Sequence, residues 1–220
     1  MKTIRVRGSS EEIPVGKILC LGQNYAEHAR EMQSEVPERP VVFLKPATAL
    51  IRDGEDIIIP PISREVHHEV ELVVAIAKKG KHIAESSARE FILGYAVGLD
   101  MTLRDVQNEA KKKGLPWSVA KGFDTSAPVS EIIPASQVKS FSELEIRCSV
   151  NGTLRQKSRV GMMVFSLEQI ISYCSSVFTL ERGDLIFTGT PEGVGRVQPG
   201  DAIQAELVNF LNITHHVVSA

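Results

Sequence analysis

The sequence predicts an α+β fold with antiparallel or mixed sheets. It contains many short strand-like runs, few helix-like runs and no regular alternation of strand and helix. The chain has 220 residues, of which 43% are hydrophobic and 24% charged, so it can bury a sizeable core. We expect a short N-terminal strand segment over residues 1–16, followed by one larger domain over residues 17–220.

Charge and hydropathy exclude several classes of protein. The formal net charge is −2 and there is no long basic run, so we expect no binding to nucleic acid. No apolar run reaches the ~18 residues of a membrane span, and the N-terminus lacks the apolar segment of a signal peptide. The isolated cysteines Cys20, Cys148 and Cys174 suit reduced, packed thiols. We therefore expect a cytoplasmic protein that does not associate with membranes.

Short strands and one helix are expected in the N-terminal part of the chain. The helix is expected over residues 25–32, with Asn24 as its N-cap. His28 and Glu31 are three residues apart and share a face of this helix. They suit a general-base dyad in which the carboxylate fixes the imidazole tautomer, although a surface ion pair has the same spacing. Strand-like runs flank the helix at residues 3–7, 16–22, 41–46 and 56–59.

Two strands in the middle of the chain carry a group of carboxylates. The run over residues 67–76 is rich in β-branched and apolar residues, and Glu69 and Glu71 point to the same face of it. A second apolar run, residues 92–100, ends at Asp100. Three carboxylates form a hard, all-oxygen ligand set that suits Mg²⁺ or Mn²⁺ rather than Zn²⁺. The alternative is an exposed acidic face held by salt bridges.

Two helices with capping boxes are expected after these strands. Thr102 and Asp105 form the first box, and the helix runs to Lys113, where Gly114 ends it. The second helix begins with the box of Ser166 to Gln169 and ends at about residue 177.

The rest of the chain is expected to form strands, turns and loops. Asn151-Gly152 is the strongest short-range signal of a β-hairpin. Further strands are expected over residues 184–188 and 202–208. The glycine-rich loop 189–195 between them offers N–H groups that could hold an anion, and a plain tight turn explains it equally well. His215 and His216 are expected on the surface.

Two lysines are candidates for binding a substrate carboxylate or a developing oxyanion. Lys45 lies near the end of a strand, and Lys121 is expected in the loop over residues 115–128. A solvated surface position is the alternative for either lysine.

In these motifs the chain resembles the fumarylacetoacetate hydrolase family, and most closely its short, single-domain branch of acylpyruvase and oxaloacetate decarboxylase enzymes. The resemblance covers residue 17 to the C-terminus. It departs at Gly122, where many relatives have Ser, and at residues 159–162, where a Thr-Ser-Asp-Met run is commoner. The matching stretches, in order, are Gly22-x-Asn24-Tyr25-x-x-His28, Phe43-Leu44-Lys45-Pro46, His68-Glu69-x-Glu71-Leu72, Gly94-Tyr95, Leu99-Asp100-Met101-Thr102-x-Arg104-Asp105, Lys111 to Trp117, Ala120-Lys121-Gly122-Phe123-Asp124 and Thr188-Gly189-Thr190-Pro191-x-Gly193-Val194-Gly195.

The resemblance implies a mixed β-roll of stacked sheets with few helices, a homodimer, and a divalent cation, Mg²⁺ or Mn²⁺. It implies that Glu69, Glu71 and Asp100 bind the metal. His28, Glu31 and Lys121 are then the catalytic residues. The residues expected to bind substrate are Lys45, Arg104, Gln107 and Thr190.

The implied reaction is hydrolysis of a C–C bond in an acylpyruvate, with the enolate of pyruvate as leaving group. Decarboxylation of oxaloacetate, or interconversion of keto and enol forms of a 2-oxo acid, would use the same enolate. A metal-stabilised binding domain without activity is the rival outside enzymes. The dyad and Lys121 argue against it, because a structural metal site needs ligands but no base.

Overall fold

The computed structural model describes residues 1–220 and confirms an α+β fold of mixed sheets with few helices. Its central sheet has six strands, and all neighbouring strands run antiparallel except β15 and β3, which are parallel. In spatial order these are β12 (Ile133–Pro134), β9 (Ile92–Leu99), β8 (Val70–Ile76), β15 (Leu185–Phe187), β3 (Lys17–Gly22) and β4 (Val41–Pro46).

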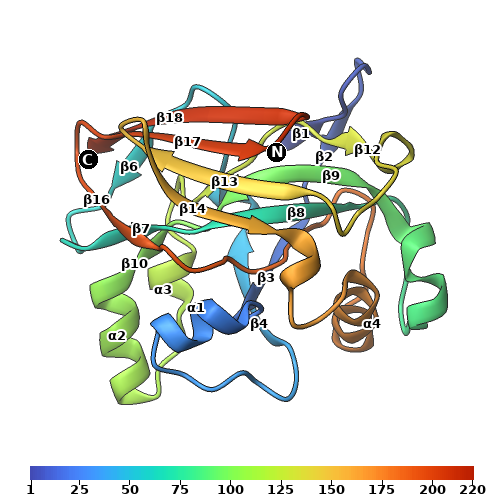
Figure 1. Ribbon diagram of the computed structural model, residues 1–220, viewed down its shortest axis with the longest axis horizontal. Helices are drawn as coiled ribbons and strands as arrows, with labels where there is room; N and C mark the ends of the chain where they lie inside the picture. Colours follow the sequence, from blue (N-terminus) through green and yellow to red (C-terminus); the bar gives the residue numbers. More distant parts are fainter.

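A second sheet of five strands packs on the first. In spatial order it contains β14 (Thr153–Arg159), β13 (Glu145–Val150), β17 (Ala202–Leu207), β18 (Leu211–Ser219) and β6 (Ile57–Ile59). β13 contacts β8, while β17 and β18 contact β9, and the larger apolar core of 37 buried residues includes side chains from both sheets (Figure 1). β8 is buried at all seven positions, which explains its nearly unbroken apolar sequence.

Three small sheets complete the fold. They pair β1 (Thr3–Arg5) with β2 (Glu12–Pro14), β11 (Ala127–Pro128) with β5 (Leu50–Ile51), and β7 (Val66–His68) with both β10 (Thr102–Leu103) and β16 (Gly195–Val197). Ile4, Ile13 and Val15 of the N-terminal segment join a second core cluster with residues of the central sheet. The N-terminal segment therefore packs on the domain. The boundary that we predict at residue 16 stays a prediction.

The helices α1 (Ala26–Glu31), α2 (Arg104–Lys113) and α3 (Ser118–Lys121) lie together in the lower part of Figure 1, and α4 (Leu167–Val177) lies to their right. Short 3₁₀ turns occur at Ala47–Ala49, Glu85–Phe91, Ala135–Gln137 and Val160–Met162. None of the helices combines the length and the apolar character that crossing a bilayer requires.

The capping prediction for α4 is confirmed. The Ser166 hydroxyl accepts from the Gln169 N–H at 3.3 Å, and the Gln169 amide oxygen accepts from the Ser166 N–H at 2.9 Å. The turn predictions are also confirmed, because Asn151, Gly152 and Gly114 all have positive φ.

The two other capping predictions are wrong. Asn24 caps no helix, because its side chain accepts from the Phe165 N–H and donates to the Thr188 carbonyl. Thr102 lies in β10, and α2 begins at Arg104 without a side-chain cap. In both cases a tertiary hydrogen bond takes the polar side chain away from the helix end.

Two predictions about burial had opposite outcomes. The three cysteines are free and buried, as expected of packed thiols. The prediction that His215 lies on the surface is wrong, because its side chain is fully buried in β18 and its Nδ1–H donates to the Glu55 carbonyl at 2.7 Å.

Candidate active site

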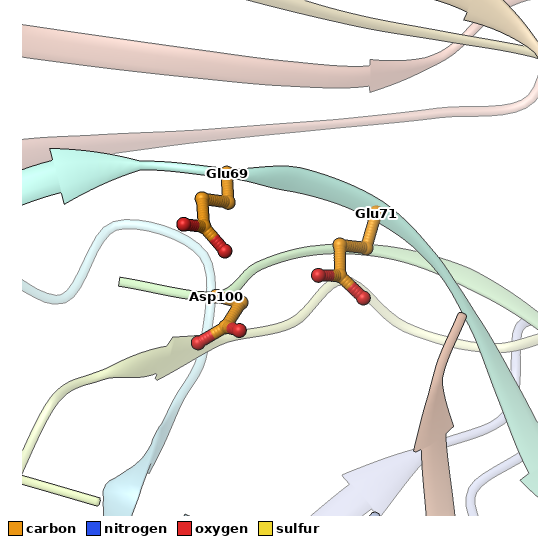
Figure 2. A group of neighbouring side chains, drawn as sticks. All are labelled: Glu69, Glu71 and Asp100. Atoms are coloured by element: carbon orange, nitrogen blue, oxygen red, sulfur yellow. The ribbon is translucent and has the colours of Figure 1, made fainter. Parts of the chain in front are cut away.

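The pairing of β8 with β9 brings the three predicted carboxylates together. Glu69 comes directly before β8 and Asp100 directly after β9, and the two strands are antiparallel, with Val70 opposite Leu99. The Asp100 N–H donates to the Glu69 carbonyl at 2.8 Å, which extends this pairing to the acidic residues. Figure 2 shows Glu69 and Glu71 projecting from the same side of their strand, with Asp100 next to them. The start of β8 and the end of β9 therefore bring the three carboxylates into one site.

All three carboxylates are buried. Glu69 is 5% exposed, and Glu71 and Asp100 are each 1% exposed. One oxygen from each lies within 4.8 Å of the others. Burying like charges this closely costs free energy unless cations compensate them, so the charges around the group decide what it can bind.

Lys121 compensates two of the carboxylates. Its ammonium donates to Glu69 Oε2 at 2.8 Å, to Asp100 Oδ2 at 2.6 Å and to the Thr102 hydroxyl at 2.6 Å. Burial alone would lower the pKa of Lys121, but Asp100 and Glu69 outweigh burial and raise it, so the side chain is a fixed positive charge. Lys121 lies at the end of α3 rather than in the loop that was predicted there.

The residue after Lys121 is held to glycine by packing. A Cβ at Gly122 would lie 2.8 Å from the Ser118 carbonyl oxygen and 3.0 Å from Pro46. A serine here would require the end of α3 to shift, which is a physical reason for the glycine at this point of departure from the family pattern.

Two further cations pair with these carboxylates, Arg104 with Glu69 and Lys45 with Asp100. The Arg104 guanidinium donates to Glu69 and, at 2.7 Å, to the Gln107 amide oxygen. The ammonium of Lys45 lies 2.8 Å from Asp100 Oδ1 and donates to the Met101 carbonyl at 3.1 Å. Burial raises the pKa of Glu69, but Lys121 and Arg104 outweigh it and hold that pKa well below its usual range.

Glu71 has no cationic side chain bonded to it. Its only hydrogen bond comes from the Gly189 N–H, which donates to Oε2 at 2.7 Å. Gly189 has φ +98°, a conformation that glycine adopts at little cost, so this N–H is placed by a glycine-specific turn. Burial and the neighbouring charges of Asp100 and Glu69 raise the pKa of Glu71 well above its usual range. A buried carboxylate that lacks a cation, beside two more carboxylates, fits Mg²⁺ or Mn²⁺.

The helix α1 places His28 and Glu31 beside the carboxylates. His28 is 6% exposed, and its Nδ1 lies 3.2 Å from Glu31 Oε2. The Gly193 N–H donates to both Glu31 oxygens, at 3.1 and 3.2 Å. Glu31 is therefore held from two sides, and the other imidazole nitrogen of His28 is left available.

One pocket collects most of the predicted site residues. Two predicted residues do not line it: Glu31, which is hydrogen bonded to His28, and Lys45, which contacts Asp100. The predicted residues that line it are His28, Glu69, Glu71, Asp100, Arg104, Gln107, Lys121 and Thr190.

Several residues at or next to the pocket were not predicted as site residues from the sequence. Lys111 and Trp117 also line the pocket, although they entered only as a family-like stretch. Gln156 does not line this pocket, but it joins the site to the second sheet. Its amide NH₂ donates to Thr190 Oγ1 at 2.8 Å, and its oxygen accepts from the Val70 N–H at 3.0 Å. It is the one buried residue of β14, whose other residues are mostly polar and even include an exposed Leu154, so no periodic pattern marks it.

Comparisons with known proteins agree with this geometry. Residues 17–218 match the family model described as fumarylacetoacetate (FAA) hydrolase C-terminal. The chain is 48% identical over 200 residues to the oxaloacetate tautomerase FAHD1, mitochondrial, of Bos taurus, covering 91% of this chain and 90% of the relative. It is also 48% identical over 195 residues to the oxaloacetate decarboxylase, mitochondrial, of Dictyostelium discoideum, covering 88% and 89%.

Among solved structures, fumarylpyruvate hydrolase from Pseudomonas aeruginosa in complex with Mn²⁺ and pyruvate superposes with a TM-score of 0.95 at 40% identity, covering 99% of this chain and 96% of that one. Both the sequence match over nearly the whole chain and the matching fold lead to one conclusion. The protein is an enzyme of the fumarylacetoacetate hydrolase family.

Proposed function

We propose that this protein is a divalent-metal-dependent enzyme that hydrolyses the C–C bond of acylpyruvates, such as acetylpyruvate or fumarylpyruvate, and releases pyruvate. The observation that carries the proposal is that the buried acidic trio and His28 line one pocket, with His28 hydrogen bonded to Glu31 outside it. A purely structural metal site would need the trio but not the base.

Glu69, Glu71 and Asp100 are the residues that would hold Mg²⁺ or Mn²⁺. When bound, the ion supplies Lewis-acid chemistry by neutralising the charge of an enolate. Glu71 supports this proposal most strongly, because it is the carboxylate that no side-chain cation neutralises. The Mn²⁺ and pyruvate in the related hydrolase structure are consistent with such a site.

The side chains around the trio would transfer the proton and stabilise the charge that develops on the substrate. His28 takes a proton from the attacking water, and Glu31 holds the imidazole by accepting from Nδ1. Lys121 lies beside Glu69 and Asp100 and offsets the negative charge that develops on the substrate oxygen.

Substrate binding falls to the polar side chains that line the pocket around this centre. Arg104, Gln107 and Thr190 contact the substrate. Lys45 lies outside the pocket and pairs with Asp100. We therefore propose that it holds Asp100 in place instead of contacting the substrate, the role that the family resemblance implies.

A second candidate is oxaloacetate tautomerisation or decarboxylation at the same site. It is favoured by the relatives that carry these names at 48% identity. Both reactions pass through an enolate, but neither needs a nucleophilic water. Tautomerisation still needs a base to take a proton from the carbon next to the keto group, so the dyad favours the hydrolase over decarboxylation but not over tautomerisation.

The proposed assembly rests on the family resemblance, and the proposed compartment and partners rest on the composition of the sequence. We propose a homodimer that works in the cytoplasm, with no nucleic-acid or membrane partner. Several curated relatives carry the word mitochondrial in their names, so cell fractionation decides between the two compartments. Light scattering of the purified protein measures the assembly.

The test of the proposed function is a substrate panel with the purified protein and Mg²⁺ or Mn²⁺. Release of pyruvate from acetylpyruvate and fumarylpyruvate is followed by a coupled assay, and the keto–enol change and loss of CO₂ from oxaloacetate are followed separately. We expect acylpyruvate cleavage to depend on the added ion. Activity on oxaloacetate alone would select the second candidate, and no turnover of any 2-oxo acid would contradict both.

A further inference from the structure

Helix α2 presents one polar face to the pocket. Arg104, Gln107 and Lys111 are spaced i, i+3 and i+7, so they share a face of the helix, and all three line the pocket. Arg104 and Gln107 are buried near the carboxylates, whereas Lys111 is exposed. The face therefore leads from the metal-binding group outward to solvent, with Lys111 at its outer end.

Lys111 differs from the other cationic side chains of the pocket in its partners. Arg104 pairs with Glu69, and Lys121 pairs with Glu69 and Asp100. Lys111 forms no ion pair, and its ammonium lies 5.2 Å from the centre of the Trp117 ring. A cation over an aromatic face keeps its capacity to bind an anion.

The charges of the pocket favour an anion at this outer end. Its three carboxylates are matched by three cationic side chains, Arg104, Lys111 and Lys121. A divalent cation in the trio adds two positive charges, and the carboxylate of one 2-oxo acid group neutralises only one.

We propose that Lys111 binds a second carboxylate at the far end of the substrate, so that the site prefers dianionic 2-oxo acids to 2-oxo acids with an uncharged tail. The inference rests on the proposed function, because it needs the 2-oxo acid group to lie at the acidic trio. It makes Lys111 a specificity-determining residue and leaves the chemistry at the trio unchanged.

Trp117 gives a direct readout of binding. It is the only tryptophan of the chain, and its ring lies beneath Lys111 and 5.9 Å from Phe43 in the same pocket. Its fluorescence should change when a ligand enters. The probes are 2-oxoglutarate and its 5-methyl ester, which have the same 2-oxo acid group and differ by one distal charge, titrated into protein saturated with Mg²⁺.

Three variants are compared with the wild type. Lys111→Met removes the charge and keeps the length, and Lys111→Arg restores a cation. Lys112→Met is the matched control, because Lys112 is the next residue of α2, is exposed and does not line the pocket. Calorimetric Mg²⁺ binding to each variant shows that the acidic trio is intact.

We expect the wild type to bind the dianion more tightly than the ester, and Lys111→Met to weaken the dianion by about tenfold, the scale of one charge-assisted hydrogen bond. Ester binding should stay the same, Lys111→Arg should recover most of the preference, and Lys112→Met should behave as wild type. Equal loss for dianion and ester, or no loss for either, would overturn the inference while leaving the proposed function standing. A wild-type protein that binds Mg²⁺ but neither probe would also overturn the inference, whereas the substrate panel decides the proposed function.

Discussion

Lys121 and Glu71 show how burial gives two charged side chains of one pocket different roles. Lys121 donates to three oxygen atoms and has a raised pKa, so it stays positive. Glu71 accepts one backbone hydrogen bond and also has a raised pKa, so without a cation its ionised form is disfavoured. The first is a permanent counter-charge, and the second is a ligand that a metal would complete.

We predict that Lys121→Met lowers kcat by about 10²–10³, the scale of one electrostatic contact to a developing oxyanion, because the variant loses the positive charge beside Glu69 and Asp100. The variant should also melt at a lower temperature without metal, because Glu69 and Asp100 lose a buried partner, and Mg²⁺ should recover part of this loss. Steady-state kinetics and thermal unfolding check it against Lys112→Met. A Lys121→Met enzyme with wild-type kcat would remove this lysine from the chemistry.

The second prediction concerns the dyad. His28→Ala should reduce acylpyruvate hydrolysis by roughly 10²–10⁴, because that reaction needs a base to activate water. Oxaloacetate decarboxylation should fall less, since it uses no attacking water. Glu31→Gln should act in the same direction but more weakly, because Glu31 only orients the imidazole. The two kcat values are measured on each variant, and equal losses on both substrates would make His28 a positioning residue instead of a base.

At the scale of elements, Gln156 joins strand β14 to the loop that carries Thr190. Its amide group makes four contacts: the oxygen accepts from Val70 N–H and lies 2.9 Å from His68 Nδ1, and the NH₂ group donates to Thr190 Oγ1 and the Pro191 carbonyl. The amide is thus fully hydrogen bonded, which fixes the loop against β8.

We predict that Gln156→Met, which keeps the length but removes these bonds, lowers the free energy of unfolding by about 1–3 kcal/mol, the cost of unsatisfied buried groups. KM should rise more than kcat falls, because Thr190 is proposed to bind substrate. Gln204→Met in β17 is the control, since Gln204 is half-exposed and lies outside this network. Denaturant unfolding and kinetics check the prediction, and an unchanged KM would show that the network is structural only.

The helix caps show which local features could be predicted from the sequence. The box of Ser166 and Gln169 is confirmed because both partners lie within one turn, so no tertiary contact is needed to form it. Asn24 and Thr102 have equally good capping side chains, but each bonds to a distant segment: Asn24 to Phe165 and Thr188, and Thr102 to Lys121. Local patterns fail where a buried polar group has a stronger tertiary partner.

At the scale of the whole molecule, the acidic trio follows from sequence because strand alternation and a strand end define it. The counter-charges do not, because Lys45, Arg104 and Lys121 come from three separate elements that only the folded sheets bring together. The burial of His215 follows a local pattern instead: Leu211, Ile213 and Val217 of β18 are buried with it, and they alternate with exposed polar residues.

Buried histidines make stability depend on pH. Burial lowers the pKa of His215, and nearby Asp53, Glu55 and Asp56 only partly oppose this. The unfolded chain takes up a proton as the pH falls below about 6.5, while the folded chain does not, so stability is present above that pH and lost below it. We predict that the melting temperature of the Mg²⁺-saturated protein falls between pH 7.5 and 5.5, and that it falls less for His215→Gln. An equal fall in the melting temperature of the wild type and His215→Gln would show that His215 does not contribute to this pH dependence.

The central claim is that Glu69, Glu71 and Asp100 bind one divalent cation, and metal titration tests it most directly. Calorimetry on chelator-stripped protein should show one Mg²⁺ or Mn²⁺ per chain. Glu71→Gln should weaken binding strongly, because it removes the charge of the carboxylate that no side-chain cation neutralises. Glu27→Gln is the control, since Glu27 pairs with Arg30 on the exposed side of α1. Unchanged metal binding in Glu71→Gln, with the fold intact, would contradict the account.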